Sequence, residues 1–329
     1  MSPQAMPRAP QLPSPGVAAT ATAESAIIEA HRRITGLHQQ FLRQQEALTR
    51  LLAVGPLVVD DVLDPDVDTW LHDHCPHPTA PGLPMMCIAD RLAGIAAGYA
   101  DGPVHALREV TLRRWLPVPR RVHLRATATG PRHAPSVTLL RWREASDPRL
   151  SGFDEVATAV ATTEAPVPPV RFAPLADAVP VENPYRTATL FHGLSFQYLS
   201  SASIGTAGAC GTLDAARGTV PSATLRAGLL DAALHVLPHR ELHRWMSGLP
   251  AGRAAFPHRL AWLRLYEPLP AAGFVDVEAR FAGTTGDPHP LPVIDVQLCT
   301  GERVLVDFRL VAVLVTPDQL SAYLAARPA

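Results

Sequence analysis

Two clusters of ionisable residues stand out in this 329-residue sequence. The segment 70–77 reads Trp-Leu-His-Asp-His-Cys-Pro-His and precedes an apolar stretch. The segment 229–235 reads Leu-Leu-Asp-Ala-Ala-Leu-His, so Asp231 and His235 are four residues apart and share one face of a helix. An imidazole that is neutral near pH 7 can remove a proton, and a buried carboxylic acid can donate one. The two clusters therefore indicate general acid–base chemistry.

The aspartate has two interpretations from its own neighbourhood. An aspartate inside an apolar helix is costly unless it is paired or functional. In the structural interpretation, His235 satisfies the Asp231 carboxylate and the pair only stabilises the helix. In the catalytic interpretation, the carboxyl group transfers a proton. Taken without the rest of the sequence, the local residues favour the structural interpretation.

A metal site is the alternative for the first cluster. His72, His74, Cys75 and His77 carry donor atoms, and His72-Asp73 is similar to a motif of metal-dependent phosphohydrolases. Such sites need ligands on helices or from a distant cluster, whereas the prolines at 76, 78 and 81 exclude a helix here. We therefore expect no metal. The remaining histidines of interest are expected to lie in loops, turns, caps or on the surface: His72, His77, His192, His239, His243 and His258.

Both clusters adjoin an internal repeat. Apolar helices are predicted at 84–99 and 225–245, and each is followed by four strand-like segments in the same order. Several segments alternate apolar and polar residues, as strands with one buried face do. The segments are 104–118, 121–129, 137–143 and 153–163 in the first copy, and 259–268, 274–281, 293–299 and 303–315 in the second.

A helix that is apolar on nearly every side must be surrounded by other elements. A curved antiparallel sheet around each helix meets this need, which predicts an α+β fold of the double hotdog type preceded by an N-terminal helix. The repeat alone also fits other α+β duplications. The predicted parts are a disordered tail at 1–22, a linker or docking helix at 23–54, a first hotdog half at 55–165, a proline-rich connector at 166–184, a second hotdog half at 185–318 and a C-terminal tail at 319–329.

The N-terminal helix, from about 25 to 53, has apolar residues at heptad spacing. It is interpreted either as a linker that lies on its own domain or as a pairing or docking helix. Four heptads are near the minimum length for a stable coil.

Three stretches of the chain resemble the dehydratase domains of modular polyketide synthases, and most closely those of bacterial polyunsaturated fatty acid synthases. The resemblance implies that His74 is the base that removes the α-proton of a 3-hydroxyacyl thioester, and that Asp231 is the acid that protonates the departing hydroxyl. It places His235 where the family orients that carboxylate. The stretches are Asp73-His74-Cys75-Pro76 with Leu83-Pro84-Met85-Met86, then Phe191-His192-Gly193 with Phe196-Gln197, and Leu230-Asp231-Ala232-Ala233 with His235, Pro238-His239 and Leu242-His243-Arg244-Trp245.

The resemblance also implies a substrate tunnel. The N–H groups around Gly82 or Leu83, at the start of the first apolar helix, are expected to meet the enolate-like oxygen. The other residues expected to bind substrate are Met85, Gly193, Leu194, Phe196 and Gln197. Departures from the family pattern are Pro78 four residues after His74, and Leu194-Ser195 where the family usually has a proline after the glycine. They make the tunnel shape the least certain part of the resemblance.

The implied reaction is dehydration of a 3-hydroxyacyl chain on an acyl carrier protein to a trans-2-enoyl thioester. A double-bond isomerase, a cyclase like the product-template domains, or a non-catalytic structural domain are the alternatives on the same fold. The carrier's phosphopantetheine would hold the substrate, so no separate cofactor is expected. Expected partners are the acyl carrier protein, other synthase domains and, as a further option, a second copy of the chain.

Composition excludes several other classes. The formal net charge is −1, so neither nucleic acid nor an anionic membrane is expected as a partner. The sequence shows neither a bilayer-spanning run nor a signal peptide, and its four cysteines lack pair spacing, so a cytoplasmic location is expected. A basic stretch around 115–119 is either a carrier docking site or a solvated face. It contains Arg113, Arg114, Arg120 and Arg121.

Overall fold

The computed structural model describes residues 28–45, 55–76, 80–187, 189–246, 253–285 and 290–316. The chain divides into two units, Met1–Gly55 and Pro56–Ala329. In the first unit residues 28–45 are helical with exposed side chains, among them Ile34, Leu37 and Phe41. The remainder of the predicted helix and the two predicted tails lie outside the described residues.

The second unit is built on one sheet of twelve antiparallel strands. Their order across the sheet is β1-β3-β4-β5-β2-β9-β12-β11-β10-β8-β7-β6. The first five strands are β1 (Leu57–Leu63), β2 (Ala106–Leu112), β3 (Val122–Thr129), β4 (Ser136–Arg143) and β5 (Gly152–Thr162). The others are β6 (Val179–Val181), β7 (Leu199–Ile204), β8 (Gly208–Asp214), β9 (Ala254–Leu265), β10 (Phe274–Thr285), β11 (Leu291–Thr300) and β12 (Arg303–Val315).

The sheet contains the internal repeat. Counted outward from the junction of β2 and β9, the order is 2-5-4-3-1 on one side and 9-12-11-10-8-7-6 on the other. The first five strands of each side share one topology, and β7 and β6 extend the second half. β2 and β9 join them antiparallel, with Leu107 opposite Leu263, and both leucines are fully buried. The repeat predicted from the sequence is thus confirmed.

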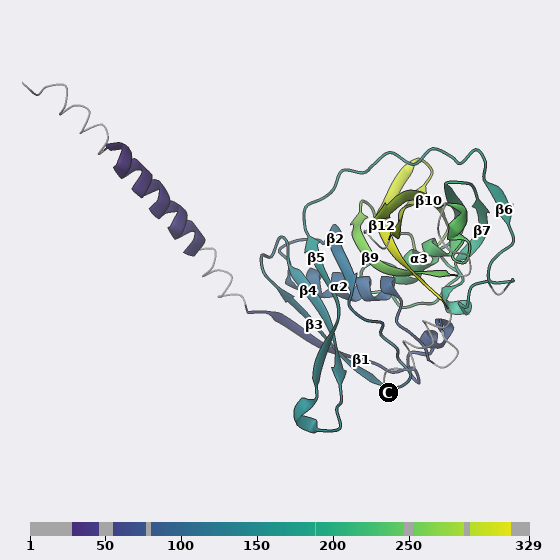
Figure 1. Ribbon diagram of the computed structural model, residues 1–329, viewed down its shortest axis with the longest axis horizontal. Helices are drawn as coiled ribbons and strands as arrows, with labels where there is room; N and C mark the ends of the chain where they lie inside the picture. The colour runs from purple at the N-terminus through teal and green to yellow at the C-terminus, as the bar shows by residue number, and fades with distance from the viewer. Residues whose placement is uncertain are drawn as a thin grey trace, which may run out of the picture. The chain divides into compact units, whose positions relative to one another are not determined.

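Each half packs its sheet against a helix. α2 (Met85–Tyr99) belongs to the first half and α3 (Ala227–Ala232) to the second. In Figure 1 the strands of the first half, in blue and teal, lie beside α2, and the green and yellow strands of the second half curve around α3. Small residues on α2, such as Ala89, Ala93 and Ala96, are fully buried, which lets the strands approach closely.

The second helix is much shorter than predicted. Instead of extending over 225–245, α3 ends at Ala232 and continues as a 3-10 helix, Ala233–Val236, with another at Leu242–Arg244. Leu237 is extended, with a ψ of 142°, because a residue that precedes a proline is disfavoured in the helical region. Pro238 therefore ends the helix.

The proline-rich connector also differs from its prediction as a segment poor at pairing. Within it, β6 pairs with β7 and forms one edge of the sheet. Arg171 forms ion pairs with Asp276 and Glu278 of β10, and the Phe172 N–H donates to Gln297 Oε1 at 2.8 Å. Side chains of the second half thus hold the connector against the sheet.

Candidate active site

His74, the residue predicted to be the base, lies in a short segment that follows β1. A 3-10 helix, Thr69–Asp73, buries Leu71 and ends at His74, whose N–H donates to Leu71 O. The His74 ring nitrogen Nδ1 lies 2.6 Å from Gly82 O. A carbonyl oxygen can only accept, so Nδ1 carries the proton and Nε2 has a free lone pair. The pKa of His74 is lowered, because the effect of burial is larger than the opposite effect of the nearby Asp231 carboxylate.

A second segment, 191–197, packs against the first, and we call the contact between the two segments the crossing. His74 and His192 form an isolated antiparallel bridge, and the Gly193 N–H donates to Asp73 O at 2.8 Å. The Asp73 carboxylate accepts the Ser195 N–H at 2.8 Å. A Cβ on Gly193 would overlap that carboxylate, so only glycine allows the two segments to approach this closely. The crossing places His192 beside His74, with ring centroids 5.1 Å apart.

Asp231, the residue predicted to be the acid, lies on α3, which the first half anchors through Asp90. The two Asp90 oxygens accept three backbone N–H groups, from Ala223, Thr224 and Leu225, at 2.6–2.8 Å. Arg226 follows with left-handed backbone angles, φ 52° and ψ 54°, and α3 begins at the next residue. A side chain of α2 thus fixes the loop that aims α3, and with it Asp231, towards the crossing.

Two histidines flank the Asp231 carboxylate. Oδ2 lies 3.5 Å from His235 Nε2 and 3.7 Å from His192 Nε2. The Tyr185 hydroxyl accepts the Leu199 N–H and has two possible acceptors for its own proton, His235 Nδ1 at 2.7 Å and Phe196 O at 3.3 Å, of which the nearer is Nδ1. Burial raises the pKa of Tyr185, so its hydroxyl stays protonated and can donate to Nδ1. In that tautomer the N–H of His235 is on Nε2, which lies 3.5 Å from Asp231 Oδ2 without forming a hydrogen bond to it.

Three atoms of this cluster are buried without a hydrogen-bond partner among the described residues. They are His192 Nδ1, Asp231 Oδ2 and His235 Nε2. Leaving a buried polar atom unsatisfied costs about 1–3 kcal/mol, so such atoms are rare and call for a functional explanation. Burial also lowers the pKa of His192 well below its ordinary value, which keeps that ring neutral. The cluster is therefore prepared to receive a polar group from outside the chain.

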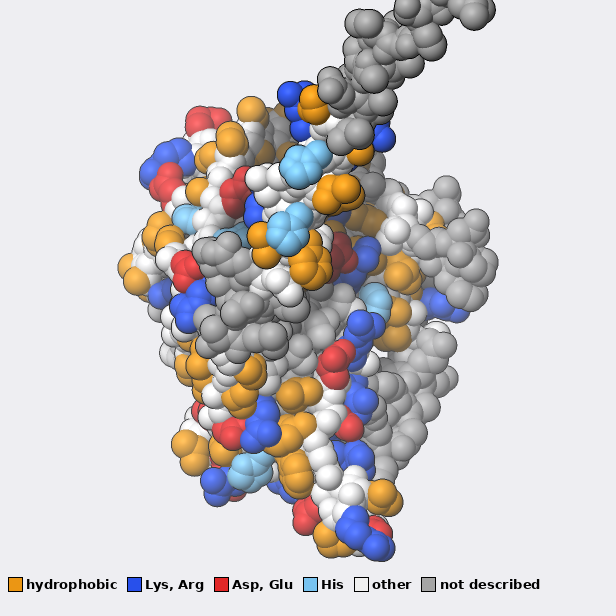
Figure 2. All heavy atoms as spheres, turned by 90° about the vertical axis from the view of Figure 1, so that its left-hand side faces the viewer, with side chains coloured by type: hydrophobic (Ala, Val, Ile, Leu, Met, Phe, Trp, Pro, Cys, Tyr) orange, Lys and Arg blue, Asp and Glu red, His pale blue; other side chains and the backbone are white. Residues whose placement is uncertain are grey.

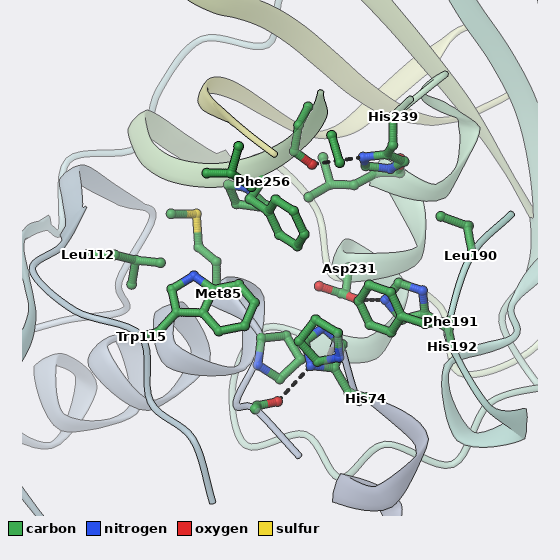
Figure 3. A pocket seen from close by; sticks show the side chains of 18 of the residues that line it. His74, Met85, Leu112, Trp115, Leu190, Phe191, His192, Asp231, His239 and Phe256 are labelled. Atoms are coloured by element: carbon green, nitrogen blue, oxygen red, sulfur yellow. Dashed lines mark hydrogen bonds and ion pairs between the residues drawn. The ribbon is translucent and has the colours of Figure 1, made fainter. Parts of the chain in front are cut away.

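These residues form one end of a cavity of about 450 Å³. In Figure 3 the side chains of His74, His192 and Asp231 face the same space, and Met85, Trp115 and Phe256 lie around its other side. The lining comes from both halves of the sheet. Its apolar part includes Leu83, Pro84, Met85, Ile88, Leu112, Trp115, Leu116, Leu190, Phe191, Leu234, Phe256 and Val315, and its arginines are Arg114, Arg240 and Arg253. A cavity with one polar end and apolar walls suits a chain molecule with a reactive polar group.

Six of the ten predicted site residues line this cavity and four do not. The six are His74, Gly82, Leu83, Met85, Asp231 and His235. Leu194 is 77% exposed, whereas Phe196 is fully buried with its ring centroid 5.4 Å from that of His74. Gln197 donates from Nε2 to His192 O at 2.9 Å. These three residues and Gly193 belong to the crossing and do not line the cavity.

The N–H groups of Gly82 and Leu83, expected to bind the enolate-like oxygen, are already hydrogen-bonded within the chain. The Gly82 N–H already donates to His74 O at 3.0 Å, and the Leu83 N–H to Leu116 O at 2.9 Å. The first backbone hydrogen bond of α2 runs from the Ile88 N–H to Pro84 O. The N–H groups of its first turn therefore have no acceptor within the helix. They belong to Met85, Met86 and Cys87, and Met85 lines the cavity.

Two histidines were misjudged from the sequence. His192, expected to shape a turn, lies beside Asp231 in the cavity. His239, expected at a cap or the surface, also lines the cavity, and its ring nitrogens lie 2.7 Å from Leu234 O and 3.3 Å from Ala255 O. The position of His192, directly before Gly193 and the segment that resembles the family, was the available signal.

The surface charges around the basic stretch are partly paired. Arg113 Nε lies 3.2 Å from Glu155 and Arg114 Nη1 2.6 Å from Asp154. Figure 2 shows acidic and basic side chains interspersed on one face of the molecule. Within the described residues, no helix is long and apolar enough to cross a membrane.

Comparison with solved structures decides the fold. The dehydratase domain of PpsC from Mycobacterium tuberculosis aligns with a TM-score of 0.63 at 20% identity, covering 80% of this chain and 95% of that domain. The fold is a double hotdog. An N-terminal dehydratase from the difficidin assembly line aligns over 82% of this chain and 97% of its own, with a TM-score of 0.63 and 16% identity.

A third double hotdog broadens the range of chemistry among the structural neighbours. The bifunctional dehydratase-cyclase domain of ambruticin biosynthesis has a TM-score of 0.57 and 17% identity, and covers 79% of this chain and 92% of that domain. No family model matches the sequence, and no curated protein is detectably similar to it. At these identities the likeness establishes the fold, and the reaction has to be argued from the site.

Proposed function

We propose that this double hotdog is a dehydratase that removes water from a 3-hydroxyacyl thioester to give a trans-2-enoyl thioester. One observation carries the proposal. A histidine with a free Nε2 lone pair and an aspartate with an unpartnered oxygen face one cavity, and each comes from a different half of the sheet. The base and the acid that β-elimination needs are therefore present on the same substrate-sized space.

The reaction follows from these positions. His74 Nε2 takes the proton from the carbon next to the thioester carbonyl, and the electron pair left behind forms the new carbon–carbon double bond. The bond to the 3-hydroxyl breaks, and Asp231 donates a proton to the departing oxygen, which leaves as water. Charge that develops on the thioester oxygen can be stabilised by the N–H groups in the first turn of α2, which have no acceptor within the helix.

His235 and Tyr185 act on the acid rather than on the substrate. The Tyr185 hydroxyl sets the tautomer of His235, and the His235 Nε2–H orients the Asp231 carboxylate. His192 also approaches this oxygen, and its ring packs against that of His235, with centroids 4.0 Å apart. These three side chains restrict Asp231 to a position from which it can reach the leaving hydroxyl.

The apolar walls support an acyl chain as the substrate. One structure of the PpsC dehydratase is in complex with C12:1-CoA. We extend this to the present chain as an acyl thioester carried on the phosphopantetheine of an acyl carrier protein. A role in polyketide or polyunsaturated fatty acid synthesis, beside other synthase domains and in the cytoplasm, belongs to the same proposal.

Cyclisation is the second candidate, because a structural neighbour is a bifunctional dehydratase-cyclase. A base and an acid in one cavity can serve both reactions, as they can serve movement of a double bond. A purely structural domain is less well supported, because it would not need the unpartnered Asp231 oxygen.

The test is a mass-spectrometric assay on 3-hydroxyacyl thioesters of several lengths, on pantetheine and on a carrier protein. The wild type, His74→Ala and Asp231→Asn are compared with His123→Ala, which removes an exposed histidine of β3. We expect the wild type and the control to release one water, and both site variants to be at least about 100-fold slower. A product of unchanged mass with a moved double bond or a new ring would favour isomerisation or cyclisation. Turnover that survives in both site variants would place the active site elsewhere.

A further inference from the structure

The polar end of the cavity has the donor set of a metal site. One ligand atom each from His74, His192 and Asp231 lies within 4.8 Å of the others. Two imidazoles and one carboxylate, with the open side towards a cavity, are found in catalytic zinc sites and in the two-histidine, one-carboxylate iron sites. This set differs from the histidine-rich segment considered in the sequence, because only His74 is common to both.

The donor atoms are already oriented for a ligand. Metal-binding histidines nearly always donate their other ring N–H to a carbonyl or carboxylate, and His74 Nδ1 does so to Gly82 O. Asp231 and His235 are 6% and 4% exposed, and Asp231 Oδ2 and His235 Nε2 have no hydrogen-bond partner among the described residues. His235 Nε2 lies 3.5 Å from Asp231 Oδ2, so a small movement would let it hydrogen-bond to the carboxylate that holds the ion.

The spacing of the donor atoms is close to that of a metal site for one pair and wider for the third atom, within 4.8 Å. In a tetrahedral site with bonds of about 2.0–2.1 Å, neighbouring ligand atoms are roughly 3.3 Å apart. The separation of 3.7 Å between His192 Nε2 and Asp231 Oδ2 is close to this value. The remaining adjustment falls on His74, which lies in a loop segment between a 3-10 helix and α2.

We propose that His74, His192 and Asp231 bind a divalent transition-metal ion of the Zn²⁺ type and that the bound ion blocks the proposed reaction. The ion takes the Nε2 lone pair that His74 needs as a base and the oxygen through which Asp231 acts. Binding itself does not depend on the proposed function, whereas the inhibitory consequence rests on it. The ion therefore competes with the substrate for the polar end of the cavity.

The binding test uses the full chain after metal removal, titrated calorimetrically with ZnCl₂ in a non-coordinating buffer. The wild type is compared with His192→Gln and with the control His123→Gln. We expect one saturable site in the wild type and the control, and affinity at least about 100-fold weaker in His192→Gln. Titration with Co²⁺ provides an independent readout, because its visible spectrum reports the coordination geometry, and the same variant should lose the low-coordinate spectrum.

Asp231→Asn, with near-ultraviolet circular dichroism to verify its fold, repeats the test if His192→Gln does not fold. Equal Zn²⁺ affinity in the wild type and the site variants, or no saturable site at all, would overturn the proposal. The inhibitory part is measured separately, as turnover with increasing Zn²⁺ and its recovery with a chelator. Turnover that is unaffected at saturating Zn²⁺ would overturn inhibition alone. A chain that binds Zn²⁺ through His192 but dehydrates no substrate would refute the proposed function and leave the metal site standing.

Discussion

Two aspartates, Asp90 and Asp231, lie on the helices that occupy equivalent places in the two halves. They are almost equally buried, at 5% and 6% exposure. The Asp90 oxygens accept three backbone N–H groups from the other half. Asp231 Oδ2 has no hydrogen-bond partner within the described part of the chain. Burial alone therefore does not distinguish a structural carboxylate from a reactive one, whereas the hydrogen-bond partners do.

The difference has an energetic meaning. Hydrogen bonds from backbone N–H groups to a charged acceptor contribute about 1.5–3 kcal/mol each, so Asp90 offsets its own burial and stabilises the junction. An unpartnered buried oxygen is a cost that the remainder of the fold must offset. Such a cost is typical of sites that hold a group ready for a ligand. Substituting the two aspartates should therefore give opposite results.

The largest effect is expected for Asp231→Asn. Because the amide cannot donate an acid proton to the leaving hydroxyl, we expect the dehydration rate to fall by about 10²–10⁴-fold. The free energy of unfolding should change by no more than about 1 kcal/mol, since the replaced oxygen has no hydrogen-bond partner to lose among the described residues. Turnover by mass spectrometry and urea denaturation measure the two quantities. A marked loss of stability in this variant would assign Asp231 the structural role.

The converse experiment is Asp90→Ala. Three N–H groups at 223–225 lose their acceptor, so we expect the free energy of unfolding to fall by about 3 kcal/mol or more. Urea denaturation measures the loss. Asp101→Ala is the matched control, because Asp101 is exposed and its ion pair with Arg132 lies at the surface. If Asp90→Ala were as stable as this control, the proposed anchoring of α3 by α2 would be wrong.

Most of the fold could be predicted because its signals are local. The apolar α2 and the alternation in β3 and β10 are visible in a few residues each. The helix at 225–245 was predicted too long because its apolar residues continue beyond Pro238, which ends it. The strands β7 and β8 were missed because serine, alanine and glycine dominate them, and these residues have weak strand preferences. Their pairing comes from neighbours in the sheet.

The residues of the site also divide into those with a local sequence signal and those placed by long-range contacts. The types and spacing of His74, Asp231 and His235, together with the repeat and the resemblance, suggested that they act together, and they line one cavity. The place of His192 depends on the bridge to His74 and on Gly193 fitting against Asp73. These contacts join residues more than 100 positions apart, so no local pattern reports them. The N–H groups of Gly82 and Leu83 were misassigned for the same reason, because their acceptors are set by the folded loop.

Tyr185→Phe tests whether Asp231 depends on support from its neighbours. The variant removes the hydroxyl that contacts His235 Nδ1 and leaves a buried nitrogen without its partner, so we expect a loss of about 1–3 kcal/mol in the free energy of unfolding. The dehydration rate should fall by less than in Asp231→Asn, because the acid itself remains. Tyr266→Phe is the control, because its hydroxyl bonds to Asp307 outside the cavity. A rate equal to the wild type would mean that the tautomer of His235 is not set by Tyr185.

The smallest difference between a variant and the wild type is expected in the pH dependence of stability, which tests the buried histidines of the cavity. Burial lowers the pKa of His74, His192 and His239 in the folded chain, whereas in the unfolded chain each should titrate near its ordinary value of about 6.5. Below that pH the unfolded state binds more protons than the folded state, so the free energy of unfolding is complete above about pH 7 and falls as the pH is lowered.

Each of these histidines can contribute a slope of at most about 1.4 kcal/mol per pH unit. Urea denaturation between pH 5 and 8, in the presence of a chelator, measures the slope for the wild type and His192→Phe. We expect a shallower slope in the variant, because one of the histidines that resist protonation is gone. An unchanged slope would mean that the folded chain accepts the proton on His192 without cost, which would contradict its burial beside His74 and His235. The activity profile adds a second check, since a base with a lowered pKa should keep the dehydration rate on its plateau to a pH below 6.5.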